Sequence, residues 1–153
     1  MQKPEKTLAE HPFFEGLASD LLKTIASCSV EANYKAGQII YNEGDTANQF
    51  LLILDGKVAI EIFSAERGSL TIKTIGSGEV LGWSWLFAPY RRRFDARALE
   101  KTSAIALDGK VLREKAEADH HLGYELLKRF SSVVVDRLNA TSLQLLDIYG
   151  KHA

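Results

Sequence analysis

The spacing of apolar residues along this chain changes from a helical period to an alternating one and then back again. Near the start, apolar positions recur at helical spacing: Leu17, Leu21, Leu22 and Ile25. Ser19 and Asp20 lie at the front of this pattern and offer side-chain oxygens that commonly cap helices. The pattern therefore predicts a short amphipathic helix between Gly16 and Ser27.

The residues before this helix are mostly polar. Pro4 and Pro12 discourage a long helix there, because proline lacks a backbone N–H. We expect residues 1–13 to be a loosely held N-terminus and residues 14–150 to form one domain.

Eight short apolar segments alternate with turn residues in the middle of the chain. The segments are 30–34, 38–41, 49–54, 57–63, 70–75, 79–83, 95–100 and 102–107. Strands at such regular spacing are typical of an antiparallel sandwich or barrel. Asp55-Gly56 predicts a type I′ hairpin between two of them, since both central positions of that turn need positive φ. In the strand that follows, alternation predicts Val58, Ile60 and Ile62 facing the core, and Lys57, Ala59 and Glu61 facing water.

After Asp108 the apolar period returns to about 3.6. It predicts a helix over Val111–Glu117 and a long one over Leu122–Tyr149, ended by Gly150. The face expected to pack on the barrel consists of Leu126, Leu127, Phe130, Val133 and Val134. A second series, spaced by fours and threes, consists of Val134, Leu138, Thr141, Leu145 and Ile148. This series resembles a short parallel coiled coil that would join two copies, and the alternative is a helix that only covers the barrel.

The composition narrows the class of protein. With 153 residues, 46% of them hydrophobic, the chain can bury one continuous core. A net charge of -1 gives no basic field for nucleic acid or anionic lipid. Cys28 is the single cysteine and is expected to be a small buried side chain; the absence of a partner for a disulfide favours the cytoplasm. No apolar run approaches the roughly 20 residues that span a bilayer.

The stretch Gly82–Ala98, GWSWLFAPYRRRFDARA, carries most of the candidate chemistry. It places a glycine, two tryptophans and three consecutive arginines between predicted strands. An arginine fork gives bidentate contacts to phosphate oxygens, and backbone amides at a helix start can bind the same anion. We therefore predict a pocket for an anionic ligand at this turn.

The predicted order of one helix, eight strands, this turn and a long helix resembles the cyclic nucleotide-binding domain superfamily, in the version found in bacterial Crp/Fnr-like regulators. The resemblance covers Phe14 to Tyr149 and is strongest over KAGQIIYNEGDTANQFLLILDGKVAI at residues 35–60. It implies an α+β fold: an antiparallel jelly-roll barrel of about eight strands at 30–107, of the double-stranded β-helix kind also seen in cupins. A short helix would precede this barrel and helices at 109–149 would follow it.

The resemblance also assigns roles at the turn. Family members that bind cAMP or cGMP have a phosphate-binding cassette that begins Gly-Glu and ends with an arginine six residues before an alanine. Gly82 fits the glycine, and Arg92 lies six residues before Ala98. The resemblance implies that amides around Trp83, Ser84 and Trp85, at a short helix start, bind the phosphate and that Arg92 pairs with its charge.

Trp83 departs from the family pattern. Cyclic nucleotide binders have a glutamate there, which accepts a hydrogen bond from the ribose 2′-hydroxyl, whereas an indole has only an N–H donor. Losing such a bond costs about 1.5–3 kcal/mol. cAMP and cGMP remain candidate ligands beside other anions. The tryptophans could stack on a base or line an apolar pocket, or, together with Phe87, fill the pocket themselves.

The other polar residues of this region have alternative roles. Alternation along a strand turns Arg91 and Arg93 away from Arg92, although an error of one residue would exchange their roles. Arg97 is interpreted as a surface ion-pair partner of Asp95. By position alone, Thr141 and Ser142 in the long helix resemble residues from which family members reach the base of the ligand.

Two functions are weighed from these residues. The first is a regulatory module that binds a small anionic effector and signals through the C-terminal helix, as a homodimer; the second is a dimerisation domain with a degenerate pocket. Only Lys151, His152 and Ala153 follow the long helix, so no recognition helix for DNA is expected in this chain. No catalytic motif, metal-ligand spacing or haem ligand is evident: His120 and His121 are adjacent and point about 100° apart on a helix.

Overall fold

The computed structural model describes residues 4–151 of the chain. The strands are β1 (Ser29–Tyr34), β2 (Ile39–Tyr41), β3 (Gln49–Asp55), β4 (Lys57–Ser64), β5 (Gly68–Gly76), β6 (Val80–Leu81), β7 (Asp95–Ala98) and β8 (Thr102–Asp108). The helices are α1 (Pro4–Glu10), the 3-10 turn η1 (Pro12–Phe14), α2 (Ser19–Ala26), α3 (Gly109–Ala118) and α4 (His120–Lys151). Each of the eight predicted strands is present, and the predicted jelly roll with flanking helices is confirmed.

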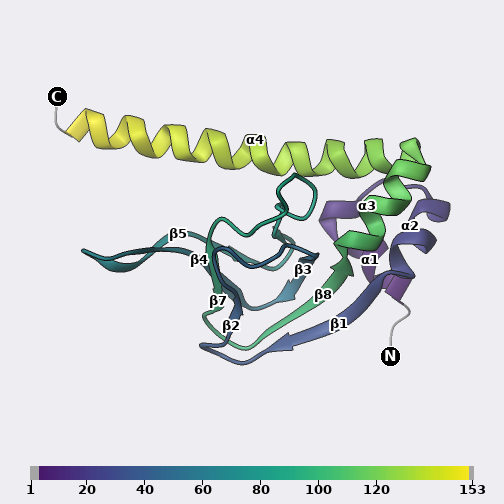
Figure 1. The fold of residues 1–153 in the computed structure, drawn as a ribbon, viewed down its shortest axis with the longest axis horizontal. Coiled ribbons are helices and arrows are strands. Elements are labelled where there is room, and N and C mark those ends of the chain that lie inside the picture. The colour runs from purple at the N-terminus through teal and green to yellow at the C-terminus, as the bar shows by residue number, and fades with distance from the viewer. Residues whose placement is uncertain (1–3, 152–153) are drawn as a thin grey trace.

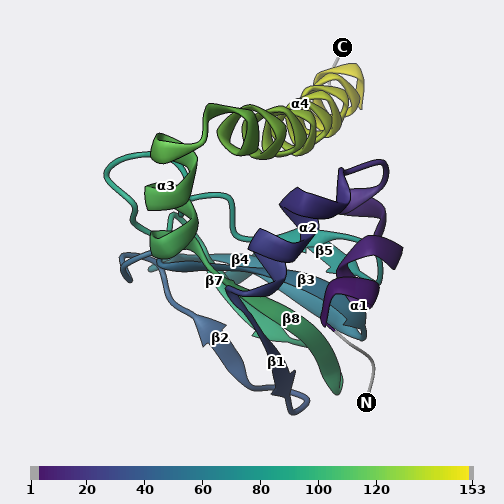
Figure 2. The same ribbon diagram turned by 90° about the vertical axis from the view of Figure 1, so that its right-hand side faces the viewer.

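The strands form two four-stranded antiparallel sheets, ordered β1-β8-β3-β6 and β2-β7-β4-β5. Leu51 and Ile53 of β3 point into the core between the sheets, while Phe50 and Leu52 point into a second core beneath the helices. This strand is thus buried on both faces, which explains its uninterrupted apolar sequence. The helices lie over the first sheet, on the face that points away from the second sheet (Figure 2).

The predicted Asp55-Gly56 hairpin is wrong. Gly56 has φ of 112°, but β3 and β4 belong to different sheets and do not pair. A local turn signal cannot specify which sheet the next strand joins, and here the chain crosses from one sheet to the other. The hairpin next in the chain joins β4 to β5, with Ser64 opposite Gly68.

The alternation predicted along β4 holds only in part. Val58 and Ile60 are buried as expected, but so are Ala59 and Glu61, and Ile62 is exposed. Glu61 is buried because its carboxylate accepts two hydrogen bonds from Arg97, at 3.0 and 2.9 Å. This bidentate pairing lowers the pKa of Glu61.

Residues 4–14 correct the expectation of a loosely held N-terminus. Pro4 is the first residue of α1, a position where its missing N–H costs nothing, and Leu8 and Phe14 are fully buried. His11 accepts a hydrogen bond from the Phe13 N–H, and its Nε2 lies 3.2 Å from the Ile53 carbonyl oxygen. Burial lowers the pKa of His11. Residues 1–3 lie outside the described part of the chain.

Two features of the other helix ends also differ from expectation. Ala18, rather than Ser19 or Asp20, precedes the first residue of α2, and its side chain makes no capping bond. Cys28, just past α2, is half-buried rather than buried.

Helix α4 is longer than predicted and leaves the barrel along its second half (Figure 1). Leu126 and Phe130 are buried as expected, whereas Leu127 is 46% exposed because it lies on the side of the helix away from the core. Gly150 lies inside the helix rather than ending it. Every side chain from residue 138 to residue 150 is exposed. His152 and Ala153 are not described.

Candidate ligand-binding cavity

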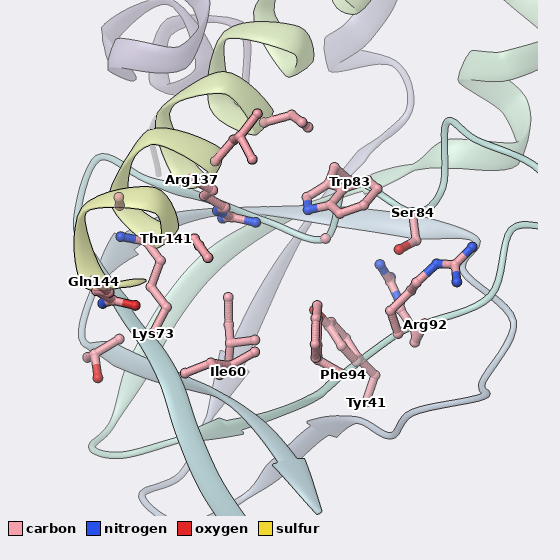
Figure 3. A pocket seen from close by; sticks show the side chains of 17 residues that line it. Tyr41, Ile60, Lys73, Trp83, Ser84, Arg92, Phe94, Arg137, Thr141 and Gln144 are labelled. Atoms are coloured by element: carbon pink, nitrogen blue, oxygen red, sulfur yellow. The ribbon is translucent and has the colours of Figure 1, made fainter. Parts of the chain in front are cut away.

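A cavity of about 540 Å³ lies between the second sheet, the loop between β6 and β7, and helix α4 (Figure 3). Small-molecule sites commonly have volumes of roughly 300–1,000 Å³. Tyr41 and Ile60 of the sheet form one wall, Gly82 and Trp83 of the loop a second, and Arg137 and other residues of α4 a third. The predicted turn therefore borders an open space large enough for a small ligand.

Gly82 and Arg92 meet at the loop wall of this cavity. Gly82 has φ of 89°, and a Cβ atom there would lie 2.5 Å from Nη1 of Arg92. Glycine is thus needed for the backbone conformation and for the close approach of the guanidinium. The spacing that selected these two residues in the sequence brings them into direct contact.

Arg92 is a buried cation without an ion-pair partner in residues 4–151. Its side chain is 5% exposed, its Nη2 donates to the Gln49 carbonyl, and its guanidinium carbon lies 4.2 Å from the ring centre of Tyr41. Nε and Nη1 have no hydrogen-bond partner. Burial lowers the pKa of Arg92, and Tyr41 and Asp45 offset part of that shift. A buried charge of this kind is stabilised by an anion that reaches it.

The two tryptophans have different environments. Trp83 is half-buried and lines the cavity. Trp85 is fully buried in the core beneath the helices, stacked on Phe50 at 4.9 Å and edge-on to Phe130 at 5.3 Å. The expectation that Trp85 contributes to the pocket is therefore wrong for its side chain, because the indole is needed to fill the core. Phe87 is exposed and does not line the cavity.

The loop after Gly82 forms successive turns instead of the expected helix start. The N–H of Leu86 donates to Trp83 O at 3.2 Å, and the N–H of Tyr90 donates to Phe87 O at 2.9 Å. Pro89 has no N–H to extend a helix, and the carbonyl of Trp85 accepts a hydrogen bond from Arg113 of α3 instead. The guanidinium of Arg113 also lies 4.0 Å from the ring centre of Tyr90, so α3 holds this loop at two points.

Alternation correctly turns Arg91 away from the cavity, but not Arg93, which lines the same cavity as Arg92. Arg91 is exposed and donates to Gly44 O and Thr46 Oγ1, outside the cavity. Arg93 is also exposed but lines the cavity rim. Arg97 forms an ion pair as expected, although its partner is Glu61 and not Asp95. Asp95 instead accepts a hydrogen bond from the Glu43 N–H.

Helix α4 adds to the cavity wall Arg137, which the sequence analysis missed, and Thr141, which it named by position. Arg137 lines the cavity, donates from Nη2 to Val80 O at 2.9 Å, and leaves Nε without a partner. Thr141 lies one turn further along the same wall, while Ser142 does not line the cavity. The sequence offers one signal for this wall: Arg137 and Thr141 are four residues apart, which places them on the same side of a helix. An arginine in an apolar helical pattern is, however, usually assigned to the solvent-facing side.

Comparison with known proteins identifies the family of this architecture. The family model described as "Cyclic nucleotide-binding domain" matches residues 31–119. The chain belongs to the cyclic nucleotide-binding domain family. The match includes the cassette loop from Gly82 to Arg92 and ends just before α4.

Two solved structures and one curated relative show where this cyclic nucleotide-binding domain has counterparts. A Geobacter metallireducens protein assigned to cyclic nucleotide binding is 30% identical, with a TM-score of 0.79 over 90% of this chain and 99% of that one. Thermus thermophilus catabolite activator protein is 25% identical, with a TM-score of 0.70 over 90% of this chain and 63% of its own.

The curated relative is a CRP-like cAMP-activated global transcriptional regulator of Mycobacterium tuberculosis. It is 21% identical over 144 residues, which cover 94% of this chain. The cyclic nucleotide-binding domain described here spans 62% of the length of that regulator. The Mycobacterium tuberculosis relative is thus a transcriptional regulator, and the Thermus thermophilus one a catabolite activator.

Two further properties of the domain concern metals and membranes. Within residues 4–151, no three metal-binding side chains of the His, Cys, Asp or Glu type come together. In the same part of the chain, no helix combines the length and hydropathy that crossing a bilayer requires.

Proposed function

We propose that this domain is a regulatory module that binds a small anionic molecule, a cyclic nucleotide or a related anion, in the cavity between the loop and α4. The observation that carries the proposal is Arg92, a buried cation with two unpartnered nitrogens, Nε and Nη1, that lies against Gly82 at the cavity wall. A buried guanidinium without an ion pair is costly, and an anion bound in the cavity would supply the missing partner.

The cavity lies where a ligand can influence the C-terminal helix. Arg92 and Trp83 come from the loop, while Val134, Arg137 and Thr141 come from α4. A molecule that contacts both the loop and α4 binds more tightly when these two elements are close together than when they are apart. Its binding therefore favours the position of α4 near the loop. We propose that α4 transmits the signal in this way and does so in a cytoplasmic homodimer.

A dimerisation domain with a degenerate pocket is the second candidate. It is favoured by Trp83 in the place of the family's glutamate and by the exposed leucines of α4. An open volume of about 540 Å³ argues against it, since Trp83 lines the cavity without filling it.

Calorimetric titration with cAMP and cGMP tests the proposed function. Replacing Arg92→Met should weaken binding at least tenfold, since a charge-assisted hydrogen bond contributes about 1.5–3 kcal/mol. The matched control is Arg91→Met, which removes the adjacent cation that points away from the cavity. Heat that persists unchanged in Arg92→Met would contradict the proposal. Absence of heat with both nucleotides up to about millimolar concentration would exclude cyclic nucleotides as the ligand and leave another anion or the degenerate pocket.

A further inference from the structure

The charges around the cavity are all of one sign. Its titratable lining residues other than Tyr41 are Lys73, Arg92, Arg93 and Arg137, and neither an aspartate nor a glutamate lines it. Burial raises the pKa of Tyr41, so this phenol is neutral and supplies no negative charge. Burial lowers the pKa of Arg92 and of Arg137, and Asp45 offsets part of that shift for Arg92 as Glu79 does for Arg137. Neither carboxylate lines the cavity, so a ligand with a single negative charge would pair with only one of these two arginines.

Two of these cations are arginines with unsatisfied donors. Arg92 has Nε and Nη1 free, and Arg137 has Nε free. Neither forms an ion pair within residues 4–151, where the recorded pairs involve other residues. The two come from different elements, the loop and α4, and Figure 3 shows them on opposite sides of the Trp83 indole in that view.

The neutral part of the cavity suits a flat apolar group. Trp83 and Phe94 contribute aromatic surface, and Ile60, Ile72 and Leu138 contribute aliphatic surface. The hydrogen-bonding groups that remain are neutral, such as Ser84, Thr141 and Gln144. No carboxylate in the lining can accept a strong hydrogen bond from a ligand hydroxyl.

From this arrangement we infer that the ligand is a small aromatic molecule with two separate anionic groups, one bound by Arg92 and the other by Arg137. The inference rests on the proposed function, because it assumes that Arg92 binds the first anion. It adds that Arg137 selects for a second anion and that the cavity does not discriminate for a ribose 2′-hydroxyl.

Three adenine ligands with different charges and hydroxyls test the inference: cAMP, 2′-deoxy-cAMP and adenosine 3′,5′-bisphosphate. The wild-type chain should bind the bisphosphate at least tenfold more tightly than cAMP, because only the bisphosphate carries two separate phosphates. It should bind cAMP and 2′-deoxy-cAMP within about twofold of each other. Arg137→Met should abolish the preference for the bisphosphate over cAMP, because it removes the cation that binds the second phosphate.

The control is Arg67→Met, which removes one exposed cation from the β4–β5 turn, outside the cavity. This variant should keep the preference for the bisphosphate, because the preference depends on Arg137 and not on the net charge of the protein. Tighter binding of cAMP than of the bisphosphate, with dependence on Arg92, would overturn the inference and leave the proposed function intact. Equal preference in wild type and Arg137→Met would also overturn it, and absence of binding by all three ligands up to about millimolar would contradict both.

Discussion

At the scale of single residues, the cavity depends on the contact between Gly82 and Arg92. A side chain at Gly82 would occupy the space of the Arg92 guanidinium, and its φ of 89° would be strained. The sequence could identify this pair because Gly82, Arg92 and Ala98 match the spacing of the phosphate-binding cassette in the family that the chain resembles. It could not separate Trp83 from Trp85, since two positions in an irregular loop carry no period that tells cavity from core.

Gly82→Ala should therefore damage both stability and binding. The left-handed backbone costs a non-glycine residue about 1–2 kcal/mol, and the new methyl group displaces Arg92. The control is Gly37→Ala, whose φ of 84° imposes similar strain with no atom within 4 Å of the added Cβ. Urea unfolding should show a loss for both that is at least as large for Gly82→Ala, whereas calorimetry should show weakened anion binding for Gly82→Ala alone. Equal affinities in the two variants would show that the Gly82–Arg92 contact is not used.

At the scale of elements, α4 is held to the N-terminal segment by Arg129. Its Nε donates to Phe13 O at 3.0 Å and its Nη2 to Glu15 O at 2.9 Å, while Nη1 pairs with Glu125. Apolar periodicity predicted α4 and its packing face, because Leu126 and Phe130 follow the helical repeat. It could not predict this polar attachment, since the partners are main-chain groups more than a hundred residues away.

Arg129→Met should loosen that attachment. Loss of the two main-chain hydrogen bonds should lower the free energy of unfolding by about 2–4 kcal/mol. Lys128→Met is the control: within residues 4–151, that exposed side chain contacts only residues of its own helix, Glu125 at 3.5 Å and the Tyr124 ring at 5.2 Å, so its loss should matter far less. Urea denaturation followed by tryptophan fluorescence measures both. Similar midpoints for the two variants would mean that the Arg129 contacts contribute little to stability.

At the scale of the whole molecule, the second half of α4 exposes apolar side chains that a lone chain does not cover. Leu145 is 50% exposed and Ile148 is 53% exposed, and both belong to the seam predicted from the sequence. The jelly roll and the long helix could be predicted from the sequence, because the alternating and helical spacings of apolar residues that mark strands and helices are local patterns. It could not predict which sheet each strand joins, because pairing across the barrel depends on contacts distant in sequence.

We expect the chain to dimerise through this seam. Leu145→Glu should weaken the dimer at least tenfold, since a charge would be buried against its symmetry mate. Leu143→Glu is the matched control: Leu143 is 66% exposed and lies two positions from Thr141, on the other side of the helix. Sedimentation velocity over a range of concentrations measures the change. A wild-type chain that stays monomeric at tens of micromolar would contradict the expectation, as would equal dissociation by both variants.

The central claim is that an anion enters the cavity lined by Trp83 and Arg92, and the two tryptophans provide the most direct test. The chain has only these two indoles, one lining the cavity and one in the core. We would record their indole N–H signals by ¹H–¹⁵N NMR while adding cAMP or adenosine 3′,5′-bisphosphate, with Trp83→Phe to assign the pair. The account predicts a saturable shift that is larger for Trp83 than for Trp85 and is lost in Arg92→Met. Two unmoved signals at millimolar ligand, or a shift that survives Arg92→Met, would contradict it.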